Sequence, residues 1–250
     1  MANPIEQFIV VSLTDNKPEI YGMDLSFTNA SLWMVITACV SILFLTIAMH
    51  RKAMVPGRLQ MTAELIYEFI SKMVTDNIGK KGRHYFPFIF TIFMFVFVGN
   101  IMGLLPYSFT YTSHLIVAGV MALCIMFMTV IFGVYNHGLK FFSLFLPPNV
   151  PWWLVAFVVP IEIISFFVRP ITHSVRLCAN MMAGHLILKV ILGFSVAAVG
   201  MGSYWSILAI LPMLVDVAFL VFELLVACIQ AYVFAILSCV YLKDTVDLHH

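Results

Sequence analysis

Charged residues are scarce in this 250-residue chain. They make up 10% of its positions, whereas hydrophobic residues make up 62%. Soluble domains are usually about 25% charged and about 45–50% apolar, and a soluble fold of this length cannot hide so much apolar surface. The formal net charge is only +1, and neither a basic stripe nor a nucleic-acid-binding motif is present, so nucleic acid is not expected as a partner. The composition predicts an all-α polytopic membrane protein.

Cysteine motifs and targeting signals are also lacking. The chain has no C-x-x-C pair and no zinc-ligand spacing, so neither a disulfide framework nor a metal site is expected, and no cofactor is indicated. The N-terminal segment lacks the basic region and cleavage site of a signal peptide and the Arg-rich composition of a transit peptide. The first apolar run is therefore expected to stay in the protein as a membrane helix.

Long apolar runs are what the sequence has in quantity. A membrane-spanning helix needs about 20 largely apolar residues. After an outer segment over residues 1–31, the first such helix is predicted over 32–49. A helical hairpin is predicted over 86–135, with a polar break at 107–113 between its two spans. Within the first of these spans, Gly99 and Gly103 form a small-x-x-x-small pattern that permits close helix approach.

Two later runs, 150–194 and 204–242, are about twice as long as a perpendicular membrane helix requires. Each holds either two short helices or one long, steeply tilted helix. Isolated prolines more often kink a helix than reverse it, and turn signals are otherwise missing. Two long helices are therefore predicted, joined by a turn at Gly200 and Gly202, and the whole of residues 1–250 is predicted to form a single membrane domain.

Residues 57–80 follow a different pattern. Apolar residues recur there at helical spacing with acidic and basic residues between them. This is typical of an amphipathic helix at the membrane interface. The alternative is an ordinary helix that faces solvent.

The basic residues of the loops predict the orientation. With the N-terminus outside, nine of them fall on the inner side, whereas only Lys17 falls outside: Arg51, Lys52, Arg58, Lys72, Lys80, Lys81, Arg83, Lys140 and Lys243. Because inner loops carry the excess of Lys and Arg, the N-terminus is predicted outside and the C-terminus inside.

Ionisable residues inside the long helices are the candidate functional groups, because such residues at membrane depth usually mark ion paths or proton relays. On the first long helix, Glu162, Arg169 and Arg176 are seven residues apart and share a face. His173 and Asn180 lie one turn on either side of Arg176 and are expected to join that stripe. His185 is about 180° away from Arg176 and about 13 Å further toward the outside.

The second long helix repeats polar residues every seven positions, at Asp216, Glu223 and Gln230. This spacing keeps one face toward a neighbouring helix, so His185 and Glu223 are predicted partners. An outward proton path can be built from Asp216, His185 and Glu223, and an inward path around Glu162. Arg176 stays protonated and cannot pass a proton, but it can block a leak between the two paths. For Asp216 and Lys189, a side chain that snorkels to or caps at the outer interface is as good an interpretation as a place on the path. For His173, a packing role is as good an interpretation as a place on the path.

The segment S-V-R-L-C-A-N-M-M-A-G-H, Ser174 to His185, resembles the signature of the a subunit of the F-type ATP synthase membrane sector, the mitochondrial subunit 6 family. The stretches Gly103–His114, His137–Ser143 and Glu223–Phe234 are similar to the same family, and the resemblance covers essentially the whole chain. The pattern is closest to alphaproteobacterial and mitochondrial members.

This resemblance implies a proton-conducting stator subunit, without a catalytic site of its own, beside a rotating ring of c subunits. It implies that Arg176 faces the ring carboxylate, that His185 and Glu223 line the outer half-channel and that Glu162 lies on the inner path. It places Asn180 and Gln230 near the arginine. The implied partners are the c ring, b-type peripheral stalk subunits, the catalytic headpiece, protons and the lipid bilayer. The implied location is a bacterial inner membrane or, alternatively, the mitochondrial inner membrane.

Two other functions compete with this one. A secondary transporter would favour internal repeats with broken helices, and no repeat is found. An intramembrane enzyme would need a nucleophile with its base or a metal-ligand motif, and neither is present in the sequence.

Overall fold

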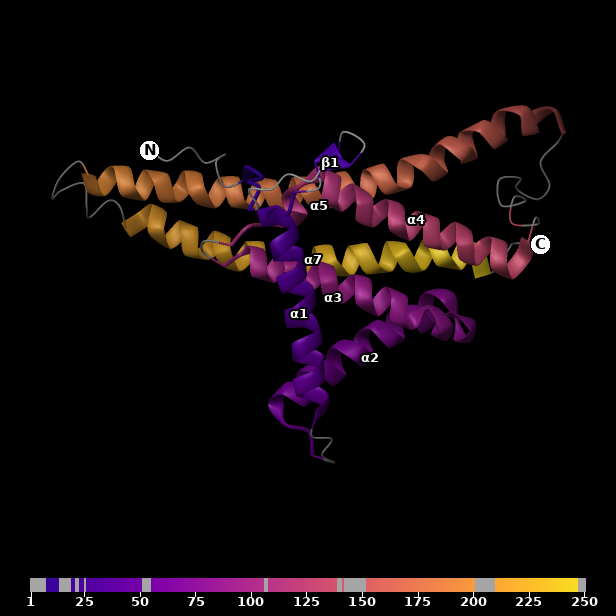
Figure 1. The fold of residues 1–250 in the computed structure, drawn as a ribbon, viewed down its shortest axis with the longest axis horizontal. Coiled ribbons are helices and arrows are strands. Elements are labelled where there is room, and N and C mark those ends of the chain that lie inside the picture. The colour runs from indigo at the N-terminus through magenta and orange to yellow at the C-terminus, as the bar shows by residue number, and fades with distance from the viewer. Residues whose placement is uncertain are drawn as a thin grey trace. The chain divides into compact units, whose positions relative to one another are not determined.

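The computed structural model describes most of the chain as helix (Figure 1). The described residues are 8–13, 19–20, 23–24, 26–50, 55–105, 108–138, 141, 152–200 and 210–246. Outside the helices, the described residues include a pair of antiparallel two-residue strands, β1 (Glu19–Ile20) and β2 (Met23–Asp24), and an isolated bridge between Ser12 and Thr28. The all-α fold class predicted from the sequence is confirmed.

Within the described residues, five helices are long and apolar enough to cross a membrane, so the chain is a multi-pass membrane protein. They are α1 (Asn29–His50), α3 (Phe86–Gly103), α4 (Leu115–His137), α5 (Trp152–Gly200) and α7 (Ile210–Val246). The helix α2 (Arg58–Ile78) is not one of them, as its amphipathic sequence predicts. Short 3-10 helices, η2 (Lys80–Tyr85) and η3 (Tyr111–Ser113), precede α3 and α4.

The helices α5 and α7 are each continuous, so the prediction of two long helices rather than two pairs of short ones is confirmed. At the helical rise they extend about 70 Å and about 55 Å. Pro160 and Pro170 lie inside α5 without ending it. The predicted turn is displaced, however, because helix continues through Gly200, where a turn was expected. Gly202, the other predicted turn residue, lies outside the described residues.

The chain divides into two compact units. The first unit takes residues 1–41, 95–114 and 177–231, and the second takes residues 42–94, 115–176 and 232–250. The helices α1, α3, α5 and α7 each contribute residues to both. Each unit has its own cluster of polar side chains.

In the second unit, the start of α3 packs against the end of α4. The Phe132 ring lies 4.9 Å from the Tyr85 ring and 6.2 Å from the Phe88 ring. The Asn136 amide donates a hydrogen bond to the Tyr85 hydroxyl. Such contacts between the beginning of one helix and the end of the next are those of a helical hairpin.

The apolar side chains of α2 do not all turn inward. Ile70, Met73 and Val74 are buried, but Leu65 and Phe69 are about half exposed, at 56% and 49%. The expected single apolar stripe is thus divided between a side that packs on the protein and a side that remains open. An exposed apolar side of this kind suits a helix that lies in the membrane interface.

In the first unit, the short segment after α3 is buried, although the sequence suggested an ordinary polar break. All the described residues from Ser108 to Ser113 are buried. A Cβ on Gly99 would lie 2.7 Å from Cζ of Tyr111, and one on Gly103 would lie 2.8 Å from Cγ2 of Thr110. The two glycines therefore accommodate this segment, whereas the sequence predicted that they would admit another helix.

Candidate functional site

His185 of α5 and Glu223 of α7 lie next to each other in the first unit, where the C-terminal half of α5 runs beside the N-terminal half of α7 (Figure 1). His185 Nδ1 is 3.7 Å from Glu223 Oε1, and the two residues are only 6% and 4% exposed. This distance is slightly longer than a direct hydrogen bond. The arrangement brings together the two side chains that the sequence pattern paired.

The absence of a side chain at Gly184 makes room for the Glu223 carboxylate. A Cβ at position 184 would lie 2.8 Å from Glu223 Cδ and 3.1 Å from its Cγ, with Oε1 closer still. Contacts under 3.0 Å force one of the two groups to move. Neither carboxylate oxygen has a hydrogen-bond partner among the described residues. Among the described residues, the His185 ring is therefore the polar group that faces this buried acid.

Thr110 is the functional candidate that the sequence did not single out. Its hydroxyl Oγ1 is 2.9 Å from His185 Nε2, and the pair is buried. In addition to Thr110, three of the six residues from Ser108 to Ser113 carry aliphatic hydroxyls. Such a composition is typical of a solvent-exposed turn, so it did not indicate a buried contact. The signal that could have found Thr110 is the resemblance of Gly103–His114 to the family, which extends through the break.

Two further polar residues of the helix pair meet a turn or two away. The Asn180 amide donates a hydrogen bond of 3.0 Å to Gln230 Oε1. Asp216 is half-buried, and its Oδ1 has no hydrogen-bond partner among the described residues. The heptad from Asp216 through Glu223 to Gln230 thus lies on the less exposed side of α7, as its spacing predicts.

A cavity of about 730 Å³ borders His185 in the first unit. It is lined by the start of α1, the end of α3 with the segment that follows it, and α5: Asn29, Trp33, Gly103, Leu104, Leu105, Ser108, Phe109, His185, Leu188, Lys189 and Leu192. His185 thus lies between an open cavity and a buried carboxyl group, which is the position of a proton relay.

The second unit holds a separate ion pair. Arg169 and Glu162, seven residues apart on α5, approach to 3.6 Å between Nη2 and Oε1, and both side chains are partly exposed. The Arg169 guanidinium also lies 5.5 Å from the centre of the Tyr241 ring, within the range of a cation–π contact. Glu162, the predicted inner-path carboxylate, is therefore paired with the arginine one heptad along its own helix.

His173 and Arg176 lie on different sides of α5. His173 is 2% exposed, with its ring 3.8 Å from the Phe234 ring, and neither ring nitrogen has a hydrogen-bond partner in the described part of the chain. Arg176 is exposed, and no acidic side chain among the described residues forms an ion pair with it. The polar stripe that was expected to include both residues is therefore divided. Three residues rotate the helix by about 300°, so His173 and Arg176 point in directions about 60° apart.

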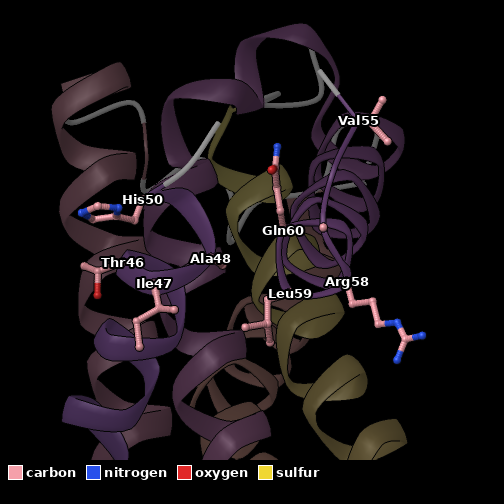
Figure 2. Close-up of a pocket in the computed structure, with 9 residues that line it drawn as sticks. Thr46, Ile47, Ala48, His50, Val55, Arg58, Leu59 and Gln60 are labelled. Carbon is pink, nitrogen blue, oxygen red and sulfur yellow. The ribbon is translucent and has the colours of Figure 1, made fainter. Parts of the chain in front are cut away.

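A second large cavity, of about 810 Å³, lies in the second unit between the end of α1 and the start of α2 (Figure 2). Its described lining includes His50, Arg58 and Gln60 among mainly apolar neighbours. Figure 2 shows the Arg58 side chain pointing away from the other labelled residues. The cavity thus lacks the converging polar groups that mark a ligand site.

Two titratable groups in the segment between α3 and α4 have shifted pKa values. Burial lowers the pKa of His114, whose ring stacks on Phe109 at 5.0 Å. Burial also raises the pKa of Tyr111, whose hydroxyl donates to the Phe95 carbonyl. Both shifts favour the neutral forms. Among the described residues, no group of three or more His, Cys, Asp or Glu side chains is placed to hold a metal ion.

These features define a class: a multi-pass helical membrane protein with a buried His–Glu pair in its long helices and an arginine on the exposed side of one of them. A family model described as ATP synthase A chain matches residues 31–243. The chain therefore belongs to the ATP synthase A chain family.

Individual relatives agree with the family match. Proteins called ATP synthase subunit a from Parvibaculum lavamentivorans, Rhizobium johnstonii and Paramagnetospirillum magneticum are 48%, 47% and 46% identical to this chain. The alignments cover 99%, 98% and 100% of this chain and 95%, 97% and 100% of those proteins. The similarity thus extends over nearly the full length of each protein.

Proposed function

We propose that this chain is the proton-conducting stator subunit of the membrane sector of an F-type ATP synthase. Two offset half-channels deliver protons to and from the carboxylate of a rotating c ring, and Arg176 separates them. Proton flow is thereby coupled to ATP synthesis. The family membership supports the assembly, and the buried His185–Glu223 pair beside an open cavity is the observation that carries the proton path.

The outer half-channel consists of Asp216, His185 and Glu223. A proton entering the cavity reaches the His185 ring, and Glu223 lies 3.7 Å beyond it. The Asn180–Gln230 hydrogen bond holds two polar side chains near the inner end of this group. These side chains can bind protons or orient water, so they provide proton-binding positions that the hydrocarbon of the bilayer lacks.

The inner half-channel begins at Glu162, and Arg176 is the barrier between the halves. Arg176 keeps its charge at any relevant pH, so it cannot relay a proton. Its exposed position on α5 leaves the guanidinium available to a carboxylate from another subunit. His173 packs against Phe234 and is assigned a supporting position on the inner path.

The proposal includes the setting of the protein. The chain acts as a single membrane domain without a catalytic site or cofactor of its own, and works with the c ring, b-type peripheral stalk subunits and the catalytic headpiece. It lies in a bacterial inner membrane with the N-terminus outside and the C-terminus inside. The bacterial relatives and the nine-to-one distribution of basic residues support this location and orientation.

Replacing Arg176 tests the proposal. In membranes that contain the intact complex, Arg176→Ala should abolish ATP-driven proton pumping while the complex still assembles. Arg176→Lys should not restore it, because an ammonium is a compact charge without the planar guanidinium fork. Thr172→Val is the matched control, since Thr172 is also exposed, lies one turn earlier and donates its hydroxyl hydrogen to the Val168 carbonyl of its own helix. Normal coupled synthesis in Arg176→Ala membranes would exclude the proposed role.

A further inference from the structure

The Thr110 hydroxyl links His185 to the backbone of α3. Its Oγ1 is 2.9 Å from His185 Nε2 and 3.3 Å from the Gly103 carbonyl oxygen, to which it donates. A hydroxyl has one hydrogen and two acceptor lone pairs. When that hydrogen points to the Gly103 carbonyl, the oxygen accepts a hydrogen bond from the ring.

This arrangement determines which ring nitrogen of His185 carries a fixed proton. With the Thr110 hydrogen on the Gly103 carbonyl, Nε2 is the donor of the 2.9 Å contact, so the neutral ring holds its proton at Nε2 and presents a lone pair at Nδ1. Nδ1 is the nitrogen that faces Glu223. In a histidine, the hydrogen bond made by one nitrogen sets the role of the other.

We propose that Thr110 is a positioning residue for proton exchange at His185: it holds Nε2–H and reserves Nδ1 as the nitrogen that gains and loses the proton. The inference rests on the proposed function, because it specifies how a residue of the proposed outer half-channel works. In the transfer step, the Nδ1–H bond breaks and an Oε1–H bond forms on Glu223. An imidazolium and a carboxylate thereby become a neutral ring and a neutral acid, and the Nε2–H···Oγ1 contact is unchanged.

The same contact stabilises the protonated ring. A ring that is charged must donate from both nitrogens, and Thr110 can accept from Nε2 because its own hydrogen has an acceptor at Gly103. Removing the hydroxyl leaves the buried Nε2–H without this partner. A neutral ring avoids the loss by carrying its proton at Nδ1 instead, whereas a charged ring keeps both N–H groups, so the change disfavours the charged form. The charged groups that face the His185–Glu223 pair are Glu223 itself and Asp216 on α7, and Lys189 on α5, which lines the same cavity as His185.

Thr112 supplies a matched control for Thr110. It lies in the same short segment and is fully buried, at 0% exposed. Its hydroxyl oxygen has no hydrogen-bond partner within the described part of the chain. A Thr→Val change at either position removes a hydroxyl and keeps the branched shape, but only the change at Thr110 removes a contact with His185.

The experiment measures ATP synthesis by the intact complex in membrane vesicles, as a function of the pH on the side from which protons enter. The inner pH and the membrane potential are held fixed. For Thr110→Val, the half-maximal rate should move to lower pH by about one unit, a change equivalent to about 1.4 kcal/mol. Thr110→Ser, which keeps the hydroxyl, and Thr112→Val should keep the wild-type midpoint.

Each outcome decides the inference. If Thr110→Val and Thr112→Val give the same pH profile while His185→Ala is impaired, the role of Thr110 is wrong and the proposed proton path stands. If His185→Ala synthesises ATP normally, the proposed path itself is wrong. Should Thr110→Val fail to assemble, the comparison passes to Thr110→Ala and Thr110→Ser, and an equal midpoint in these two contradicts the inference.

Discussion

The position of Glu223 depends on a neighbouring residue that has no side chain. Because a Cβ at Gly184 would overlap the carboxyl group, Gly184→Ala must displace either Glu223 or α5. Inserting a methyl group into a closely packed site typically costs about 1–3 kcal/mol. We expect Gly184→Ala to lower the rate of ATP synthesis at least several-fold by moving Glu223 away from His185.

Gly193→Ala is the control for this prediction. Gly193 lies on the same helix, and a Cβ there would meet no atom within 4 Å. The measurement is ATP synthesis per assembled complex in membrane vesicles for both variants. Equal rates in the two variants would show that the close contact seen at Gly184 does not determine where Glu223 acts.

The neighbouring positions of His185 and Glu223 predict that their substitutions are not independent. Residues in contact show interaction energies that are absent between distant sites. The exchange of His185→Glu with Glu223→His keeps one imidazole and one carboxyl in the pair. We expect the double variant to pump more protons than either single variant. The measurement is the ATP-driven acidification of membrane vesicles. A double variant no better than the worse single variant would contradict a direct pairing.

At the scale of the helices, the sequence was most informative where spacing is regular. The heptad of Asp216, Glu223 and Gln230, and the half-turn offset of His185 from Arg176, follow from the helical period alone, and burial agrees with both. The pairing of His185 with Glu223 could be predicted because the seven-residue spacing turns the Glu223 face of the second long helix toward the first.

The segment after α3 could not be predicted in the same way. It has no period, and its hydroxyl groups are as common in exposed turns as in buried contacts. Its burial depends on Gly99 and Gly103 leaving space for Tyr111 and Thr110, which is a tertiary effect. The spacing also left packing and path membership equally open for His173, since the surroundings of a position between two faces of a helix depend on its neighbour, here Phe234.

The long helices also predict a sided pattern of access. If α5 carries the outer path at His185 and the inner path at Glu162, small ions should reach the two positions from opposite sides. We expect silver ion to inhibit Glu223→Cys and His185→Cys from the outer bath and Glu162→Cys from the inner bath. The measurement is inhibition of proton conduction after one-sided addition of silver to vesicles that lack the native cysteines.

Val168→Cys is a suitable control on the same helix, because Val168 is an exposed apolar residue that belongs to neither proposed path. It should respond much less from either bath. Inhibition of the variants at 162 and 185 from the same side would rule out two separate half-channels.

For the whole molecule, composition and run length were sufficient for the main outline. The five long apolar helices and the separate amphipathic α2 agree with the prediction because hydrophobic length directly limits what can cross a bilayer. The boundaries were less accurate: α5 extends to Gly200, since an isolated glycine near a helix end does not by itself stop the helix. The division of the described residues into two compact units had no signal in the sequence.

The orientation of the whole chain gives the last prediction. Arg83, beside the start of α3, and Lys243, near the end of α7, are both exposed, so cysteines introduced there should be accessible to a reagent. The excess of basic residues predicts that both lie on the inner side, whereas Ser12 in the exposed N-terminal segment lies outside. In intact cells whose complex lacks the five native cysteines, Ser12→Cys should react with a membrane-impermeant thiol reagent. Arg83→Cys and Lys243→Cys should react only after the membrane is permeabilised or inverted.

Because five spans place the two ends of the chain on opposite sides, labelling of Ser12→Cys and Lys243→Cys from the same bath would contradict the number of spans. Labelling of Arg83→Cys and Lys243→Cys from the outer bath, with Ser12→Cys protected, would instead reverse the orientation and exchange the proposed outer and inner half-channels.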